Sequence, residues 1–179
     1  LRHPIVVEYI LTVAADDIDN HPRRAAVYIP ALWEIIDQAP PGNELTGEHF
    51  RVAQAVSLLA DIDHAESLEL LSVVLAQPYS AGVRAVAAGL MTSTNPNICD
   101  LMAPLLASPY SELAVDAAMA LGSHGDPRAN AYLLEILRDR ERYASSTVTV
   151  SAWYLLKNTG QAKRVSEAHK GNFGLALII

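Results

Sequence analysis

The chain has 179 residues, of which 51% are apolar and 18% are charged, with a net charge of −7 and an isoelectric point near 5.3. This composition excludes intrinsic disorder, which requires low hydrophobicity and high charge. The acidic balance argues against a nucleic-acid partner, because binding phosphates requires a basic surface. The uncharged stretches are too short to cross a membrane, and no basic segment precedes an apolar one as in a signal peptide. The single cysteine permits no intrachain disulfide, and we expect one cytoplasmic domain.

Apolar residues recur at helical spacing along the chain, which predicts an all-α fold. In chain order, the predicted helices cover Pro4–Ala15, Pro22–Gln38, Gly47–Ala60, His64–Ala76, Ala81–Met91, Pro96–Ala107, Glu112–Gly122, Pro127–Arg138, Ser145–Asn158 and a short segment within Gln161–Lys170. The loop Ala39–Asn43 is a clear helix breaker. Thr147–Val150 alternates as a strand would, but the repeat described below places it in a helix. Pro30 and Pro104 fall inside predicted helices, where we expect a shared kink.

Capping residues mark the predicted helix starts. Asn95 and Asp126 each precede a proline, which suits the first helical position because it lacks an N–H group. The segment Asp63–Glu66 has the pattern of a capping box. Ser80 and Ser111 are expected to cap the helices that follow them.

An internal repeat organises these helices. Pro78–Ser80 recurs as Pro109–Ser111, at an offset of 31 residues. The same offset aligns Leu59 with Leu90 and Leu90 with Leu121, and beyond them it grows to 34 residues. A period near 31 is typical of a helix–turn–helix unit and is too short for a propeller blade.

The segment Ala120–Ala129 resembles the ALGxxGDPRA junction of HEAT-like repeats of the phycobilisome-lyase type. Pro78–Ala88 is similar to the second helix of that repeat, and Pro104–Leu106 suits its first helix. The resemblance covers about Gly47–Gly160, and it implies a right-handed α-solenoid of about four repeats with atypical terminal caps. The implied boundaries are a cap over 1–21, repeats over 22–62, 63–94, 95–125 and 126–160, and a cap or continuation over 161–179.

The residues that could carry chemistry have structural explanations. The acidic run Asp16–Asp19 with His21 lacks the spacing of a calcium-binding loop, and a similar run at Asp61–His64 favours a capped interhelix turn in both places. The absence of His-Glu dipeptides excludes the iron-dependent hydroxylases built on HEAT-like repeats.

Two further features are expected to be structural. Cys99 lies on an apolar helix face with no basic neighbour in sequence, so we expect a buried, inert thiol. Gly122–Gly125 lacks the lysine of a phosphate-binding loop, and a helix-ending turn explains both glycines. We therefore expect no catalytic residue, no cofactor and no metal.

The repeat also predicts a binding surface. In α-solenoids the second helices of the repeats line a groove, and equivalent outward positions form columns across the repeats. The two predicted columns are Ser57, Ala88, Met119 and Trp153, and Gln54, Ala85, Asp116 and Val150. Arg84 stands where the family carries an arginine in its second helix. The predicted partner-binding residues are Gln54, Ser57, Arg84, Asp116, Met119 and Trp153. In an alternative arrangement, the segment after Gly160 covers Trp153.

Three functions are compatible with this pattern. The first is a non-enzymatic scaffold that binds a basic or mixed-charge protein partner without a cofactor, because an acidic surface attracts such molecules. The second is a lyase-like or other catalytic HEAT-repeat protein that holds a small molecule. The third is the helical segment of a larger protein, suggested by the start at Leu1 and the apolar end at Ile179.

Overall fold

The computed structural model describes residues 3–42, 44–62 and 64–161. All regular elements in these ranges are helical, which confirms the predicted all-α class. Contacts divide the chain into two compact units, residues 1–101 (unit 1) and 102–179 (unit 2). The solenoid and its repeat boundaries stay predictions.

The elements are α1 (Pro4–Asn20), η1 (Pro22–Tyr28), α2 (Ile29–Asp37), α3 (Gly47–Asp61), α4 (Ala65–Leu75), α5 (Ala81–Leu90), α6 (Ile98–Met102), η2 (Ala103–Ala107), α7 (Ser111–Ser123), η3 (Pro127–Ala129), α8 (Asn130–Arg138), η4 (Arg140–Arg142) and α9 (Ser145–Asn158), where η marks a 3₁₀ helix.

None of the helices in the described ranges combines the length and the apolar character that a bilayer-spanning helix needs.

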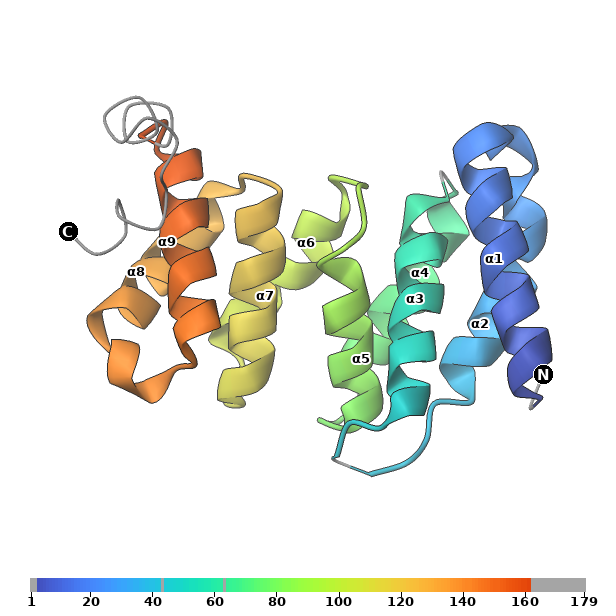
Figure 1. Ribbon diagram of the computed structural model, residues 1–179, viewed down its shortest axis with the longest axis horizontal. Coiled ribbons are helices and arrows are strands. Elements are labelled where there is room, and N and C mark those ends of the chain that lie inside the picture. The colour runs from blue at the N-terminus through green and yellow to red at the C-terminus, as the bar shows by residue number, and fades with distance from the viewer. Residues whose placement is uncertain (1–2, 43, 63, 162–179) are drawn as a thin grey trace. The chain divides into compact units, whose positions relative to one another are not determined.

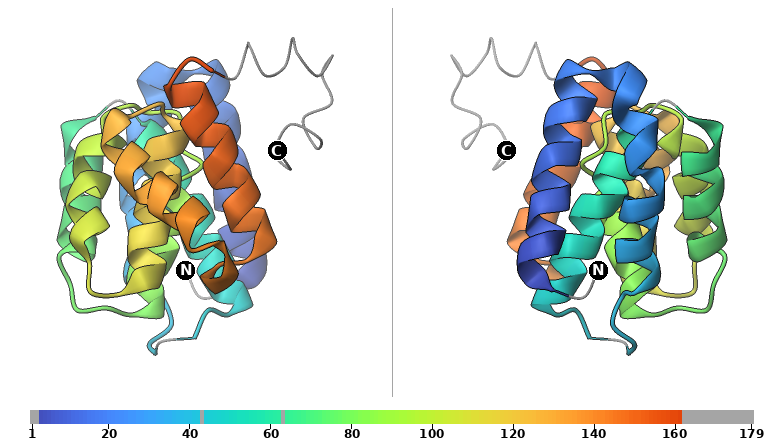
Figure 2. Two further views of the ribbon diagram at one scale, coloured as in Figure 1. Left: turned by 90° about the vertical axis from the view of Figure 1, so that its left-hand side faces the viewer. Right: turned by 90° about the vertical axis from the view of Figure 1, so that its right-hand side faces the viewer.

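In unit 1, α1, α3 and α5 lie side by side and run in the same direction (Figure 1). Arg51 near the start of α3 contacts Glu8 near the start of α1. Asp61 at the end of α3 accepts a hydrogen bond from Ser93, which follows the end of α5. Helices α2 and α4 pack on α3 as well, and η1 packs on α1 (Figure 2, right). Helix α3 is therefore the central helix of unit 1.

In unit 2, α7 is the central helix. It contacts η2, η3, α8 and α9, and α8 also packs along α9 (Figure 2, left). Helix α9 contains the segment Thr147–Val150, so the prediction of a helix there is confirmed.

The buried side chains follow the sequence repeat. Leu59, Leu90 and Leu121, which the offset of 31 aligns, are each fully buried. The repeat therefore marks the positions that form the core, because each of these leucines lies on the inner face of its helix. Two further aligned sets are buried as well: Val52, Val83 and Ala114, and Ala55, Val86 and Ala117.

Helix α1 continues to Asn20, five residues beyond its predicted end, so the expected interhelix turn at Asp16–Asp19 is wrong. Carboxylates in a last helical turn face the negative end of the helix dipole, which is unfavourable. Local donors offset this cost. The Asn20 side chain donates to Asp16, the Tyr28 hydroxyl donates to Asp17 over 2.6 Å, and His21 Nδ1 lies 3.3 Å from Asp17.

Each of the two prolines lies where the helix changes type, and the kink predicted there stays a prediction. Pro30 lies in the first turn of α2, immediately after the 3₁₀ helix η1, and Pro104 lies in the first turn of η2, immediately after α6. In both places the chain changes between helix types. A proline is tolerated in the first turn of a helix because its fixed φ suits that position.

Some of the predicted helix N-caps are confirmed and others are wrong. Ser80 caps α5 by accepting a hydrogen bond from the Val83 amide, and Asp126 caps η3 by accepting one from Arg128, so both predictions are confirmed. Ser111 is the first residue of α7 and does not cap it, and Asn95 holds the turn before α6, which begins three residues later at Ile98. Asp63 lies outside the described residues.

Candidate functional site

An apolar groove of unit 1 is formed by α1, α3 and α5, with a volume of about 610 Å³. The predicted positions Gln54, Ser57 and Ala88 lie together in it. We call it the α1–α3–α5 groove. The remaining lining residues are Glu8, Leu11, Thr12, Ala15, Phe50, Ala53, Leu58 and Thr92.

A glycine allows two walls of the groove to approach each other closely. A Cβ on Gly89 of α5 would collide with the Ala53 carbonyl oxygen and lie 2.7 Å from the Cβ of Val56, both in α3. Only a glycine therefore permits this helix spacing, and Ala88 comes to line the same groove as Ser57.

The third wall, α1, is attached to α3 by an ion pair. Arg51 Nε donates to Glu8 Oε1 over 2.8 Å. Phe50, next to Arg51, lines the groove with 72% of its surface exposed. Ile5 and Tyr9 of α1 are also largely exposed. Large exposed apolar side chains beside an apolar groove are typical of binding surfaces.

The end of α3 is fixed to the segment that follows α5. Asp61 Oδ1 accepts hydrogen bonds from the Ser93 hydroxyl over 2.7 Å and from the Thr94 amide over 2.7 Å. The Asn95 amide group donates to the Ala60 carbonyl over 2.7 Å. Asp61, predicted to lie at a capped interhelix turn, is the last residue of α3 and connects two helices that form the groove.

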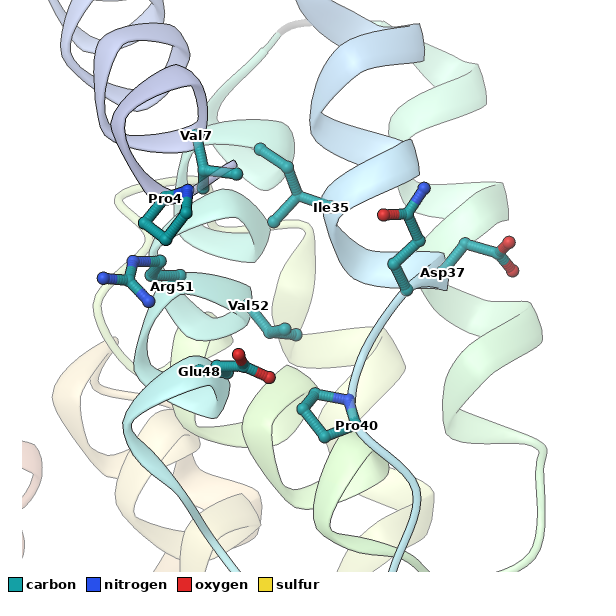
Figure 3. Close-up of a pocket in the computed structure, with 9 residues that line it drawn as sticks. Pro4, Val7, Ile35, Asp37, Pro40, Glu48, Arg51 and Val52 are labelled. Carbon is teal, nitrogen blue, oxygen red and sulfur yellow. The ribbon is translucent and has the colours of Figure 1, made fainter. Parts of the chain in front are cut away.

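A second cavity, of about 490 Å³, lies between α1, the end of α2 and the start of α3 (Figure 3). Its lining combines the apolar side chains of Val7, Ile35 and Val52 with the charged side chains of Asp37, Glu48 and Arg51. The loop beside it is attached to α3 through His49, whose Nε2 lies 3.2 Å from the Pro40 carbonyl oxygen. Arg51 lines this second cavity and Glu8 lines the α1–α3–α5 groove, so their ion pair lies between the two cavities.

The other predicted binding residues lie elsewhere. Arg84 of α5 is half-buried and lines neither of these two cavities. Asp116, Met119 and Trp153 belong to unit 2. Met119 is only 5% exposed, so its expected surface position is wrong. Helix α7 buries eight of its residues, and it contacts η2, η3, α8 and α9.

The same correction applies to Ala85, which is 2% exposed because α5 packs on α3 at this position. Trp153 is 36% exposed. The alternative in which a later segment covers Trp153 concerns residues 162–179, which lie outside the described residues.

Cys99 is buried, as predicted. Gly125 has a φ of +77° and ends α7, as predicted, whereas Gly122 lies within the helix and contacts the ring of Tyr154. In the described ranges no three His, Cys, Asp or Glu side chains come together as metal ligands would.

Two tyrosines of the described chain have a raised pKa. The hydrogen bond to the Asp17 carboxylate raises the pKa of Tyr28, and burial raises the pKa of Tyr132. Neither tyrosine lines the α1–α3–α5 groove or the second cavity. These shifts therefore belong to helix packing and mark no reactive centre in the cavities.

The predicted binding surface did not include α1, because α1 lies outside the repeat from which the columns were aligned. The apolar spacing of Leu11 and Ala15 next to polar Thr12 is the signal that indicates this role. In comparisons with known proteins, the chain matches no family model, no curated protein and no solved structure.

Proposed function

We propose that this chain is a non-enzymatic, HEAT-like scaffold that binds a segment of another protein in the α1–α3–α5 groove. One observation carries the proposal: three parallel helices form an apolar groove of about 610 Å³ with Phe50 exposed along it. Binding of an amphipathic helix in such a groove is a recurring mode of peptide recognition.

The chemistry of the lining supports binding rather than catalysis. Hydroxyl and amide groups come from Thr12, Gln54, Ser57 and Thr92, and the carboxylate of Glu8 is already paired with Arg51. These neutral groups can orient a peptide by hydrogen bonds. A serine or threonine nucleophile needs a general base within hydrogen-bond reach, and Glu8, the one carboxylate of this lining, is held by Arg51.

The resemblance to HEAT-like repeats supports the same function, because that family mostly binds proteins. A small ligand in the cavity of Figure 3 is the alternative, and its charged lining residues favour it. The two cavities share α1 and α3 but have no lining residue in common, so a substitution in one cavity separates the two functions.

The test is a selection of displayed random peptides on the full chain. Ala88→Arg places a long side chain in the groove, and Ser72→Arg on the exposed face of α4 adds the same charge elsewhere. We expect the selected peptides to lose at least about tenfold in affinity for Ala88→Arg, since a blocked groove excludes its occupant, and to bind Ser72→Arg as they bind the unchanged protein. Equal binding to both variants would refute the groove as the site.

A further inference from the structure

We propose that the occupant of the α1–α3–α5 groove is a basic amphipathic helix, with its cations at the end of the groove where α1, α3 and α5 terminate. This inference rests on the function proposed above and adds the chemistry of the partner.

The groove continues into an acidic surface at that end. Glu8, Thr12 and Ala15 of α1 line the groove, and Asp19 follows at the next position of the same helical face. Asp16 is adjacent, and both Asp16 and Asp19 are exposed. A ligand helix that extends along the groove therefore reaches these carboxylates.

The helix dipoles add to this negative potential. Because the three helices run in the same direction, α1 ends at Asn20, α3 at Asp61 and α5 at Leu90 on the same side of unit 1. The C-terminus of a helix carries about half a negative charge, so parallel ends reinforce one another. Cations of a bound helix are favoured there.

Positive charge inside the groove is scarce. Glu8 is its only charged lining residue, and no Lys or Arg lines it in the described part of unit 1. Arg23 and Arg24 of η1 are exposed but do not line the groove. Residues 1–101 carry 13 acidic and 5 basic side chains, so the long-range field of this unit also attracts a cationic partner.

The shape of the groove favours a helix over a bulky ligand. Ala15, Ala53, Ser57 and Ala88 are small, so a helix backbone can approach closely, and Phe50 offers an aromatic contact along the groove. The expected partner therefore has a narrow aliphatic face and basic residues at the end that lies beside Asp16 and Asp19.

The experiment measures the binding of two labelled helical peptides to the full chain by fluorescence anisotropy. Both carry Ala and Leu on one face, and the other positions are lysine in one peptide and glutamate in its twin. We expect the lysine peptide to bind at least about tenfold more tightly than the twin, and added salt to reduce the difference.

Four variants of the chain locate the site. Ala88→Arg and Ala88→Glu block the groove with opposite charges, and we expect both to weaken binding of the lysine peptide. The double variant Asp16→Lys/Asp19→Lys should weaken it about tenfold. These substitutions place cations in the last turn of α1, where they favour the helix. The double variant Glu66→Lys/Glu69→Lys makes the same charge change on the exposed side of α4, and it should weaken binding less.

Each other outcome overturns a defined part of the inference. If Ala88→Arg abolishes binding of selected peptides but the glutamate twin binds as tightly as the lysine peptide, the basic partner is wrong and the proposed function stands. If neither Ala88 variant changes the binding of any peptide, the groove is not the site and both proposals fail. If sedimentation shows that the chain self-associates and Ala88→Arg dissociates it, the occupant is a second copy and the inference of a basic partner helix is wrong.

Discussion

Units 1 and 2 hold their helices together in different ways. In unit 1, α5 packs on α3 through Gly89, whose neighbour is the backbone of α3, and Asp61 connects α3 to the segment after α5. In unit 2, α9 packs on α7 through Gly122, whose neighbour is the Tyr154 ring, and Lys157 Nζ donates to the Ser123 carbonyl over 3.1 Å.

The difference matters because a backbone cannot move away as a side chain can. At the α3–α5 contact the two helices bury six and seven residues, whereas at the α7–α9 contact α7 buries eight and α9 buries only Ser151. We therefore expect unit 1 to tolerate less change at its helix contacts. Trp33 lies in unit 1 and Trp153 in unit 2, so variants that keep a single tryptophan report on each unit separately.

The largest expected effect is at Gly89. Gly89→Ala should lower the free energy of unfolding by about 3 kcal/mol, because the added Cβ forces α5 away from the Ala53 carbonyl. Gly122→Ala should lower it by less than about 1 kcal/mol, since the greater helix propensity of alanine offsets part of the clash with Tyr154. Urea titrations followed by Trp33 and by Trp153 measure both effects. Equal losses would remove the distinction between the units.

The next effect is at Asp61. Asp61→Ala leaves the Ser93 hydroxyl buried without its acceptor and should cost about 2 kcal/mol. Asp61→Asn keeps an acceptor oxygen at the same position and should recover most of this loss. Thermal unfolding observed through Trp33 measures the two variants. In unit 2, Lys157→Met should cost less than about 0.5 kcal/mol, because Lys157 is exposed.

A smaller effect is expected where the helices begin. His49 forms a capping box with Thr46 at the start of α3: the Thr46 amide donates to His49 Nδ1 over 3.0 Å. Because an amide can only donate, Nδ1 accepts, and the ring proton lies on Nε2, facing the Pro40 carbonyl. His49→Phe should cost about 1 kcal/mol and His49→Gln less, since glutamine can also accept from the amide.

Helix α9 tests whether an added cap raises stability, because its N-cap residue, Ala144, has no side chain that can accept a hydrogen bond. Ala144→Ser should raise the free energy of unfolding by about 1 kcal/mol, measured in urea with the Trp153 signal. A loss of stability would show that the α9 start is constrained by contacts other than capping.

The smallest effect is the titration of Tyr28 and Tyr132. Both tyrosines have a raised pKa in the folded chain, Tyr28 mainly from its hydrogen bond to Asp17 and Tyr132 mainly from burial. Folding therefore opposes the ionisation of both, so their contribution to stability is present below the ordinary tyrosine pKa and is lost as the pH rises through the raised value. Asp17→Asn should lower the pKa of Tyr28 and leave Tyr132 unchanged. Phenolate absorbance, compared with that of Tyr28→Phe and Tyr132→Phe, measures both.

Sequence patterns predicted the helices and the core well, and they failed where the outcome depended on neighbours. The repeat aligned Leu59, Leu90 and Leu121, and all three are buried. It also placed Met119 on the surface, whereas Met119 is buried. Helix α1 was predicted to end at Ala15, because acidic runs often mark turns. It continues to Asn20, because the side chains of Asn20 and of Tyr28 in η1 donate hydrogen bonds to the carboxylates in its last turn.

The amino-acid sequence by itself determined the helical class, the positions of the helices and most of the periodic set of buried residues, because the spacing of apolar residues along a helix is a local property. Only the tertiary structure decided that α1 joins α3 and α5, that Gly89 brings α5 close to α3, and that Gln54, Ser57 and Ala88 share one groove. These features depend on the distance between helices. That distance is set by the side chains and backbone atoms that meet where two helices pack, so the residue pattern of one helix alone does not determine it.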